Sequence, residues 1–293
     1  MALENPGRAF REALGRGILP MPGVFNAITA QLARQAGFEA LYLSGAGVTN
    51  SLTGFPDIAL ITLDEMAGAA RYVCRASGLP VIADADTGYG EVLNVARAVE
   101  EFEHSGLAGI HLEDQVSPKR CGHLDGKGVI STSDMTAKIR ASVKARRNPD
   151  FFLIARTDAR GVNGFEDAVD RAKRYMAAGA DGIFPESLQS KEEFAEFARQ
   201  VKAPLLANMT EFGKTPMTTL DEFQKMGYAM VIFPMTAFRV MMKAASDLFA
   251  ELRKTGTQAA FLDRMQTRKE LYELIGYADY DRFDQEVARD NEK

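Results

Sequence analysis

Short apolar runs recur along the chain and are separated by longer segments in which apolar residues follow a helical spacing. Each run is nearly continuous in hydrophobic residues, which is typical of parallel strands covered on both faces. Glycine precedes several runs, as at Gly37, Gly106, Gly179 and Gly227, and glycine after a helix allows the left-handed turn that leads back into a strand. The eight runs span residues 21–25, 40–43, 80–83, 109–112, 151–155, 182–184, 204–207 and 230–233.

Helix-start signals lie in the segments between these runs. In a capping box a hydroxyl and a carboxylate three residues later satisfy two backbone N–H groups. The pairs with this spacing are Thr62 with Glu65, Ser190 with Glu193, and Thr219 with Glu222. Eight strands alternating with helices predict a (β/α)8 TIM-type barrel, a fold of about 250 residues. An open, doubly wound parallel sheet is the alternative.

No linker or composition break divides the chain, so we predict a single barrel domain over residues 1–293. No strand-like run follows Gly256, and residues 256–293 are predicted to form a helical extension with helices over 258–275 and 281–290. Such an extension has little core of its own. It is therefore expected to pack against the barrel or against a neighbouring subunit.

Composition narrows the possible partners. The chain has 35 Lys and Arg against 40 Asp and Glu, a net charge of −5, which disfavours nucleic acid and anionic membranes as partners. Hydrophobic residues make up 46% of the chain, but no apolar stretch reaches the roughly 20 residues of a membrane span. The polar start of the chain does not resemble a secretory signal. Because only two cysteines are present, we expect a reducing, cytoplasmic location.

Polar side chains close most of the apolar runs. In a barrel of this kind the active site lies at the carboxyl ends of the strands, so these side chains should meet there. Buried ionisable groups are costly unless they are paired or bind a metal, and their number indicates a polar ligand. They are Tyr42, Ser44, Gly45, Asp84, Asp86, His111, Glu113, Arg156, Asp158, Glu186, Asn208 and Thr210.

Asp84 and Asp86 are two residues apart at a strand end, a spacing that places both carboxylates on one face. Such oxygen ligands suit Mg²⁺, or alternatively Mn²⁺, with water and substrate completing the shell. Glu113 could join through a water. The competing interpretation is that the aspartates cap helices or pair with Arg156. Arg156 itself suits bidentate binding of a carboxylate, with an ion pair to Glu186 as the alternative.

A basic loop follows the fourth run, with the sequence Lys-Arg-Cys-Gly-His at residues 119–123. Cations and an imidazole beside Cys121 should favour its thiolate, and glycines shortly after the loop permit it to move over a site. Cys121 is therefore a candidate acid, base or nucleophile, with Lys119 and His123 as candidate catalytic partners. Cys74 lies in a helical segment and is assigned to packing.

The segment Ser44-Gly45-Ala46-Gly47 follows the second run. As a glycine-rich loop it would offer backbone N–H groups without obstruction by side chains. Such groups bind a carboxylate or a phosphate.

Taken together, these motifs resemble one known family. Glu-Asp-Gln at residues 113–115 followed by the Cys loop at 119–123 is similar to the signature of the isocitrate lyase and phosphoenolpyruvate mutase superfamily. The Lys-Arg-Cys-Gly-His loop is specific to its carbon–carbon lyases. Residues 208–213 and 265–272 also resemble members of this group, and the likeness runs from about residue 23 to residue 283.

The resemblance implies a Mg²⁺-dependent retro-aldol cleavage of 2-methylisocitrate to pyruvate and succinate, the last step of the methylcitrate cycle of propionate catabolism. It also implies a homotetramer whose paired subunits exchange a C-terminal helix. It assigns the metal to Asp84 and Asp86, with Asp57 and Glu113 contributing through waters. The residues that it assigns to the substrate are Ser44, Gly45, Ala46, Cys121, Gly122, Arg156, Glu186, Asn208, Thr210, Arg239 and Arg268.

In this chemistry Cys121 would give a proton to the carbanion that remains when the C2–C3 bond breaks. Tyr42 is the candidate for removing the proton of the C2 hydroxyl, with a water activated by the metal as the alternative. One departure from the family concerns Ala46, which stands where a run of three glycines is often found; its N–H remains available.

Alternatives to this function remain open. Isocitrate and 2,3-dimethylmalate are alternative substrates, because their lyases retain the Cys loop. Phosphonate mutases and oxaloacetate-decarboxylating members generally lack the Cys-Gly-His loop, so its presence argues against them. A non-catalytic binding barrel is the last alternative.

Overall fold

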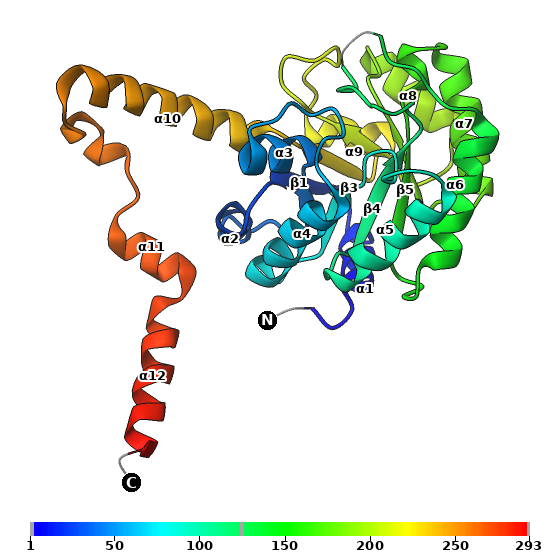
Figure 1. Ribbon diagram of the computed structural model, residues 1–293. Coiled ribbons are helices and arrows are strands. Elements are labelled where there is room, and N and C mark those ends of the chain that lie inside the picture. The colour runs from blue at the N-terminus through cyan, green and yellow to red at the C-terminus, as the bar shows by residue number, and fades with distance from the viewer. Residues whose placement is uncertain (1–2, 124–125, 292–293) are drawn as a thin grey trace. The chain divides into compact units, whose positions relative to one another are not determined.

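Eight parallel strands form one sheet in the order β6-β5-β4-β3-β2-β1-β8-β7 (Figure 1). A parallel bridge between Ile183 and Leu205 joins the two edges, so the sheet curls into a nearly closed barrel. The computed structural model describes residues 3–123 and 126–291. The predicted TIM-type barrel is confirmed, and the open, doubly wound sheet is excluded. The strands are β1 (Leu19–Val24), β2 (Leu41–Leu43), β3 (Val81–Asp84), β4 (Gly109–Glu113), β5 (Phe152–Thr157), β6 (Gly182–Pro185), β7 (Leu206–Asn208) and β8 (Met230–Phe233).

Helices surround this barrel and connect consecutive strands, as Figure 1 shows. They are α2 (Ala27–Gln35), α3 (Gly45–Thr53), α4 (Leu63–Ser77), α5 (Val92–His104), α6 (Thr132–Ala145), η1 (Ala159–Gly161), α7 (Phe165–Ala177), α8 (Lys191–Gln200) and α9 (Leu220–Met226). The capping boxes of Thr62 and Thr219 start α4 and α9 as predicted.

The capping box predicted at Ser190 forms only in part. The Ser190 hydroxyl accepts the N–H of Glu193 at 3.2 Å. The Glu193 carboxylate, however, accepts the N–H of Gln189 and three bonds from Arg160. A guanidinium is a stronger partner for a carboxylate than a backbone amide, so the returning half of the box is lost.

A helix that the sequence did not predict, α1 (Pro6–Leu14), covers the amino ends of the strands. Phe10 on α1 is fully buried, and its ring centroid lies 5.1 Å from that of Phe152 at the start of β5. Together with inward side chains such as Met21 and Ile154, these rings fill the barrel interior. The amino end of the barrel is thus filled with apolar side chains.

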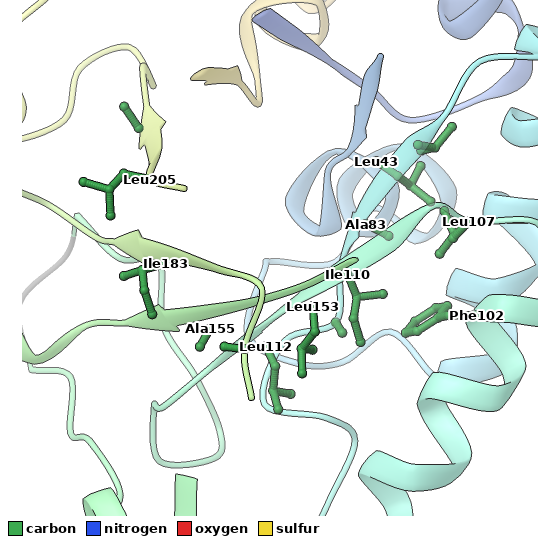
Figure 2. Close-up of a cluster of buried hydrophobic side chains, with 14 of the residues drawn as sticks. Leu43, Ala83, Phe102, Leu107, Ile110, Leu112, Leu153, Ala155, Ile183 and Leu205 are labelled. Atoms are coloured by element: carbon green, nitrogen blue, oxygen red, sulfur yellow. The ribbon is translucent and has the colours of Figure 1, made fainter. Parts of the chain in front are cut away.

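A second apolar layer lies between the strands and the outer helices. Figure 2 shows Ile110 and Leu112 of β4 and Leu153 of β5 in this layer, near Phe102 of α5. Successive residues of a strand point to opposite faces, so each strand supplies both layers. This explains why the runs are nearly continuous in apolar residues.

Contacts divide the chain into two units, Met1–Phe238 and Arg239–Lys293. The second unit contains most of α10 (Thr236–Thr255), followed by η2 (Ala259–Arg264), α11 (Arg268–Ile275) and α12 (Tyr277–Asn291). The helix predicted over 258–275 is therefore two elements, because a capping box at Thr267 starts a new helix. None of the helices in the described part of the chain is both long and apolar enough to cross a membrane.

Candidate active site

The polar side chains predicted at the strand ends do meet at the carboxyl end of the barrel. Strand register sets their neighbours, since Asp84 pairs with His111 across β3 and β4, and Glu113 pairs with Arg156 across β4 and β5. All four side chains are buried. Because α1 covers the opposite end, this end is the one available to a ligand.

Asp86 reaches the site by a turn and not by the alternation of a strand. Strand β3 ends at Asp84, and Asp86 has a positive φ of 46°. The Asp84 carboxylate accepts the N–H of Asp86 at 2.9 Å and stabilises this turn. The same-face prediction therefore gave the right neighbours for the wrong reason. Neither aspartate caps a helix or forms an ion pair with Arg156 among the contacts of the described residues.

Lys119 joins two of the predicted metal-binding aspartates. Its Nζ lies 2.5 Å from Asp57 Oδ1 and 2.9 Å from Asp86 Oδ1. Burial alone would lower the pKa of Lys119, but Asp86, Asp84 and Asp57 raise it well above its usual value. Burial raises the pKa of Asp86 to about 6 in spite of the ammonium. Lys119 is thus a fixed positive charge in the middle of an acidic cluster.

Tyr42 and His111 form a buried pair beside Asp84. The Tyr42 hydroxyl lies 2.8 Å from His111 Nε2 and 3.5 Å from Asp84 Oδ2. Burial lowers the pKa of His111 to about 4 and raises the pKa of Tyr42 well above its usual value, so both are neutral near pH 7. The assignment of Tyr42 to the proton of a substrate hydroxyl stays a prediction.

The acidic residues fit a hydrated Mg²⁺ better than a metal caged by protein. Across the residues described, no three His, Cys, Asp or Glu side chains form a ready metal site. Mg²⁺ typically uses one or two carboxylates and keeps several waters, which Asp84 and Asp86 could provide. Within the described part of the chain neither oxygen of the buried Glu113 accepts a hydrogen bond, although the Arg156 guanidinium lies 3.2 Å from Oε2. Such an oxygen is suited to a ligand's water.

Arg156 lies at the centre of a second cluster. Its guanidinium is 2.9 Å from Asp158, 3.2 Å from Glu113 and 3.7 Å from Glu186. Burial would lower its pKa, but these carboxylates raise it well above the usual value. The ion pair with Glu186, which was the alternative to substrate binding by Arg156, exists, although Asp158 is the nearer partner.

Glu186 links this cluster to the Cys loop and to β7. His123 Nε2 lies 2.8 Å from Glu186, and Asn208 Nδ2 lies 3.3 Å from its second oxygen. Burial raises the pKa of Glu186, but Arg156 and His123 outweigh burial and hold it well below the usual value. A carboxylate that stays charged can hold both the guanidinium and the imidazole in place.

The Cys loop is also held through its backbone, by side chains other than Glu186. The Gly122 carbonyl accepts bonds from Ser187, at 2.7 Å, and from Lys127. A Cβ on Gly122 would lie 2.4 Å from the Glu186 side chain and 2.6 Å from Arg156 Nη2. Only glycine permits this close approach. Residues 119–123 therefore lie directly against the buried polar side chains at the strand ends, which we call the polar ring: Asp84, Asp86, His111, Glu113, Arg156 and Glu186.

The two cysteines have opposite environments, as predicted. Cys74 is buried, and burial raises its pKa to about 12, which makes it an inert packing residue. Cys121 is exposed at the tip of the docked loop. The neighbours expected to favour its thiolate are engaged elsewhere, Lys119 with aspartates and His123 with Glu186.

The segment after β2 is the start of a helix and not a loop. Ser44 caps α3, and its hydroxyl accepts the N–H of Gly47 at 3.1 Å. A Cβ on Gly45 would lie 2.7 Å from Asp84 Oδ2, so the first turn of α3 lies against the aspartates. The first N–H groups of a helix attract anions, and Gly45 and Ala46 remain candidates for a substrate carboxylate.

The contacts described above do not test three of the predicted substrate residues. Thr210 follows β7 and is half-buried. Arg239 and Arg268 belong to the second unit. Their assignment to the substrate stays a prediction.

Sequence analysis did not identify Lys127 and Asp114 as site residues. Lys127 bonds Asp158 at 2.8 Å and so links the loop to the Arg156 cluster. Asp114 is fully buried and accepts bonds from Tyr175 and from the N–H of Asp158, at 2.7 and 2.9 Å. Its position directly after Glu113, the last residue of β4, was the available signal.

Comparison with known proteins places this geometry in a family. The family model described as phosphoenolpyruvate phosphomutase matches residues 10–253. A 2-methylisocitrate lyase of Aeropyrum pernix is 56% identical over 99% of this chain and 94% of its own. The crystal structure of a 2,3-dimethylmalate lyase, a member of the PEP mutase/isocitrate lyase superfamily, has a TM-score of 0.91 at 36% identity, covering 97% of this chain and 96% of its own. A phosphonopyruvate hydrolase, solved with oxalate and Mg²⁺, has a TM-score of 0.85 at 28% identity, covering 94% and 96%.

The family match and the near full-length relatives agree with each other and with the barrel and its polar ring. The chain therefore belongs to the phosphoenolpyruvate mutase/isocitrate lyase superfamily, and within it this enzyme is a carbon–carbon lyase.

Proposed function

We propose that the enzyme cleaves 2-methylisocitrate to pyruvate and succinate, the last step of the methylcitrate cycle in propionate catabolism. The observation that carries this proposal is the docking of the Cys121 loop, through His123 and Gly122, onto the polar ring at the carboxyl end of the barrel. Support comes from the 56% identity to a 2-methylisocitrate lyase. A non-catalytic binding barrel would not need an exposed thiol held above buried charges.

The residues of the ring suit the charges of this reaction. The C2 hydroxyl would give up its proton to the predicted base, Tyr42 or alternatively a water. The C2–C3 bond then breaks, and the electron pair remains on C3 as a carboxylate-stabilised carbanion. The Cys121 thiol would give its proton to C3, which completes succinate, while C2 becomes the carbonyl of pyruvate. The N–H groups of Gly45, Ala46 and Gly122 would bind substrate carboxylates. The docked loop would exclude water from the carbanion.

Asp84 and Asp86 would hold the metal, with Asp57 and Glu113 contributing through waters. When bound, Mg²⁺ supplies Lewis-acid stabilisation of negative charge on the substrate's hydroxyl oxygen. The Mg²⁺ complex of the related phosphonopyruvate hydrolase supports this metal, and Mn²⁺ is the alternative. Lys119 would keep the aspartates neutralised and hold the loop beside them.

A product assay tests both the substrate and the metal. The purified chain with Mg²⁺ is expected to form equal amounts of pyruvate and succinate from 2-methylisocitrate, with a higher kcat/KM than for isocitrate or 2,3-dimethylmalate. EDTA should abolish turnover, and Mg²⁺ or Mn²⁺ should restore it. A preference for either competing substrate would overturn the assignment, and turnover that survives EDTA would overturn the metal's role.

We further propose a homotetramer in which paired subunits exchange C-terminal helices. The second unit has no buried residue in α10 or α11, and Val240, Phe249, Tyr280 and Phe283 each expose more than 60% of their surface. Large apolar side chains at this exposure indicate a surface for another copy. Light scattering should give four times the chain mass, and a monomer would contradict the proposal. A cytoplasmic location stays a prediction.

A further inference from the structure

The Cys loop is built on a short antiparallel stem. Gln115 pairs with Val129, the N–H of Val116 donates to Gly128, and the N–H of Ile130 donates to Asp114. Beyond this stem the loop needs other contacts to fix its shape, because Pro118 has no N–H to donate.

Side-chain contacts fix three of the residues around Cys121. Lys119 is held by aspartates, the carbonyl of Gly122 by Ser187 and Lys127, and His123 by Glu186. All these anchors are part of the polar ring or bind to it. These anchors do not fix the orientation of the peptide between Arg120 and Cys121.

Gln115 provides that orientation. Its Nε2 donates to the carbonyl of Arg120 at 2.9 Å, and its Oε1 accepts the N–H of Arg120, also at 2.9 Å. The Arg120 carbonyl belongs to the same planar peptide as the N–H of Cys121. One side chain therefore fixes both backbone groups of the residue before the thiol.

Burial makes this contact rigid. Gln115 is 2% exposed, so water does not replace a broken bond, and an unsatisfied buried amide costs about 1–3 kcal/mol. The stem anchors the backbone of Gln115 at the same point. The orientation of the Arg120–Cys121 peptide is thus transmitted from the end of β4.

We infer that Gln115 is a positioning residue for turnover: its two hydrogen bonds to Arg120 hold the Cys121 thiol in the orientation from which it delivers a proton. This inference rests on the proposed role of Cys121 as the acid. A misplacement of about 1 Å can cost on the order of 100-fold in rate, so the bonds matter to kcat more than to substrate binding.

The test uses Gln115→Met in the full-length enzyme, which keeps an unbranched side chain of similar length and removes both bonds. With 2-methylisocitrate and Mg²⁺, kcat should fall about 10- to 100-fold, and KM should stay within about threefold. The rate at which iodoacetamide alkylates Cys121, followed by mass spectrometry, should change about threefold or more, because the reactivity of an exposed thiol depends on the charged groups held around it and a freed peptide shifts the thiol relative to them. Buried Cys74 is the internal reference.

Gln200→Met is the matched control. Gln200 on α8 also makes a side-chain hydrogen bond, to Glu196 four residues earlier, far from the loop in sequence. Its loss should change neither kcat nor Cys121 alkylation. If Gln115→Met does not fold, Gln115→Glu removes only the bond to the Arg120 carbonyl and gives the same measurements.

Unchanged Cys121 alkylation in a folded Gln115 variant would overturn the inference, whatever happens to turnover. A changed alkylation rate with the kcat of the original enzyme would confirm that Gln115 orients the thiol and overturn the catalytic role of Cys121. The two failures can therefore be told apart.

Discussion

Replacing Cys121 by serine is expected to lower kcat about 10²- to 10⁴-fold while KM changes by no more than about threefold. Serine keeps the shape of the side chain but is a far weaker proton donor than a thiol at neutral pH. The loop should stay docked, because its anchors are the side chains of Lys119 and His123 and the carbonyl of Gly122. Steady-state kinetics with 2-methylisocitrate and a binding measurement with the same substrate separate the two effects.

Cys74→Ala is the control for this substitution. Cys74 packs in the layer between the strands and the helices, 6% exposed, so its truncation should lower the melting temperature and leave kcat unchanged. A Cys121→Ser variant with undiminished kcat would remove Cys121 from the reaction. Loss of substrate binding in that variant would instead show that the thiol has a binding role.

The barrel can be predicted from the sequence because buried parallel strands are short and almost purely apolar. Strands β4 (Gly109–Glu113) and β5 (Phe152–Thr157) each extend past their apolar run into the polar residues that follow. Since parallel strands end at one edge, residues such as Glu113 and Arg156 meet without any sequence signal that links them. Fold and site are therefore predicted by the same pattern.

The partners within the site could not be predicted, because they depend on contacts across the fold. Spacing suggested that Lys119 and His123 act on the neighbouring Cys121. Buried charges are instead stable when they are paired with opposite charges. Lys119 is paired with Asp57, 62 residues earlier, and His123 lies against Glu186.

The local sequence pattern predicted the wrong backbone conformation at two positions. Glycines after β2 suggested a loop because glycine disfavours helices, yet the Ser44 cap starts α3 there. Asp86 required a left-handed turn that no two-residue alternation describes. Helix α1 was not predicted, although Asn5 followed by Pro6 is a helix-start signal that the sequence does carry.

Replacing Arg156 by methionine is expected to lower the free energy of unfolding by about 3–5 kcal/mol, because it removes one partner of a buried ion cluster. Glu113, Asp158 and Glu186 surround the guanidinium, and none of the three exposes more than 1% of its side chain. Methionine fills part of the space and leaves these carboxylates without that cation. Urea unfolding at pH 7 measures the loss.

The free energy of unfolding lost in Arg156→Met should become smaller as the pH falls. Although burial raises the pKa of Glu186, Arg156 is the chief cause that holds it below the unfolded value of 4.5. A depressed folded pKa contributes stability above the unfolded pKa, and that stability is lost as the pH falls through the folded pKa. In the variant the Glu186 carboxylate protonates at higher pH. The free energies of unfolding of the variant and the original enzyme should therefore converge below about pH 4.5.

Arg160→Met is the matched control for burial. Arg160 also binds a carboxylate, Glu193, through bonds as short as 2.6 Å, but both side chains are more than 20% exposed. A pair at this exposure contributes about 1 kcal/mol or less. Equal losses for the two variants, or an Arg156 loss independent of pH, would contradict the view that buried carboxylates depend on this guanidinium. A further substitution, Glu186→Gln in the Arg156→Met background, should recover part of the stability, because Glu186 is the carboxylate whose charge depends chiefly on Arg156 and its removal leaves one fewer buried charge unpaired.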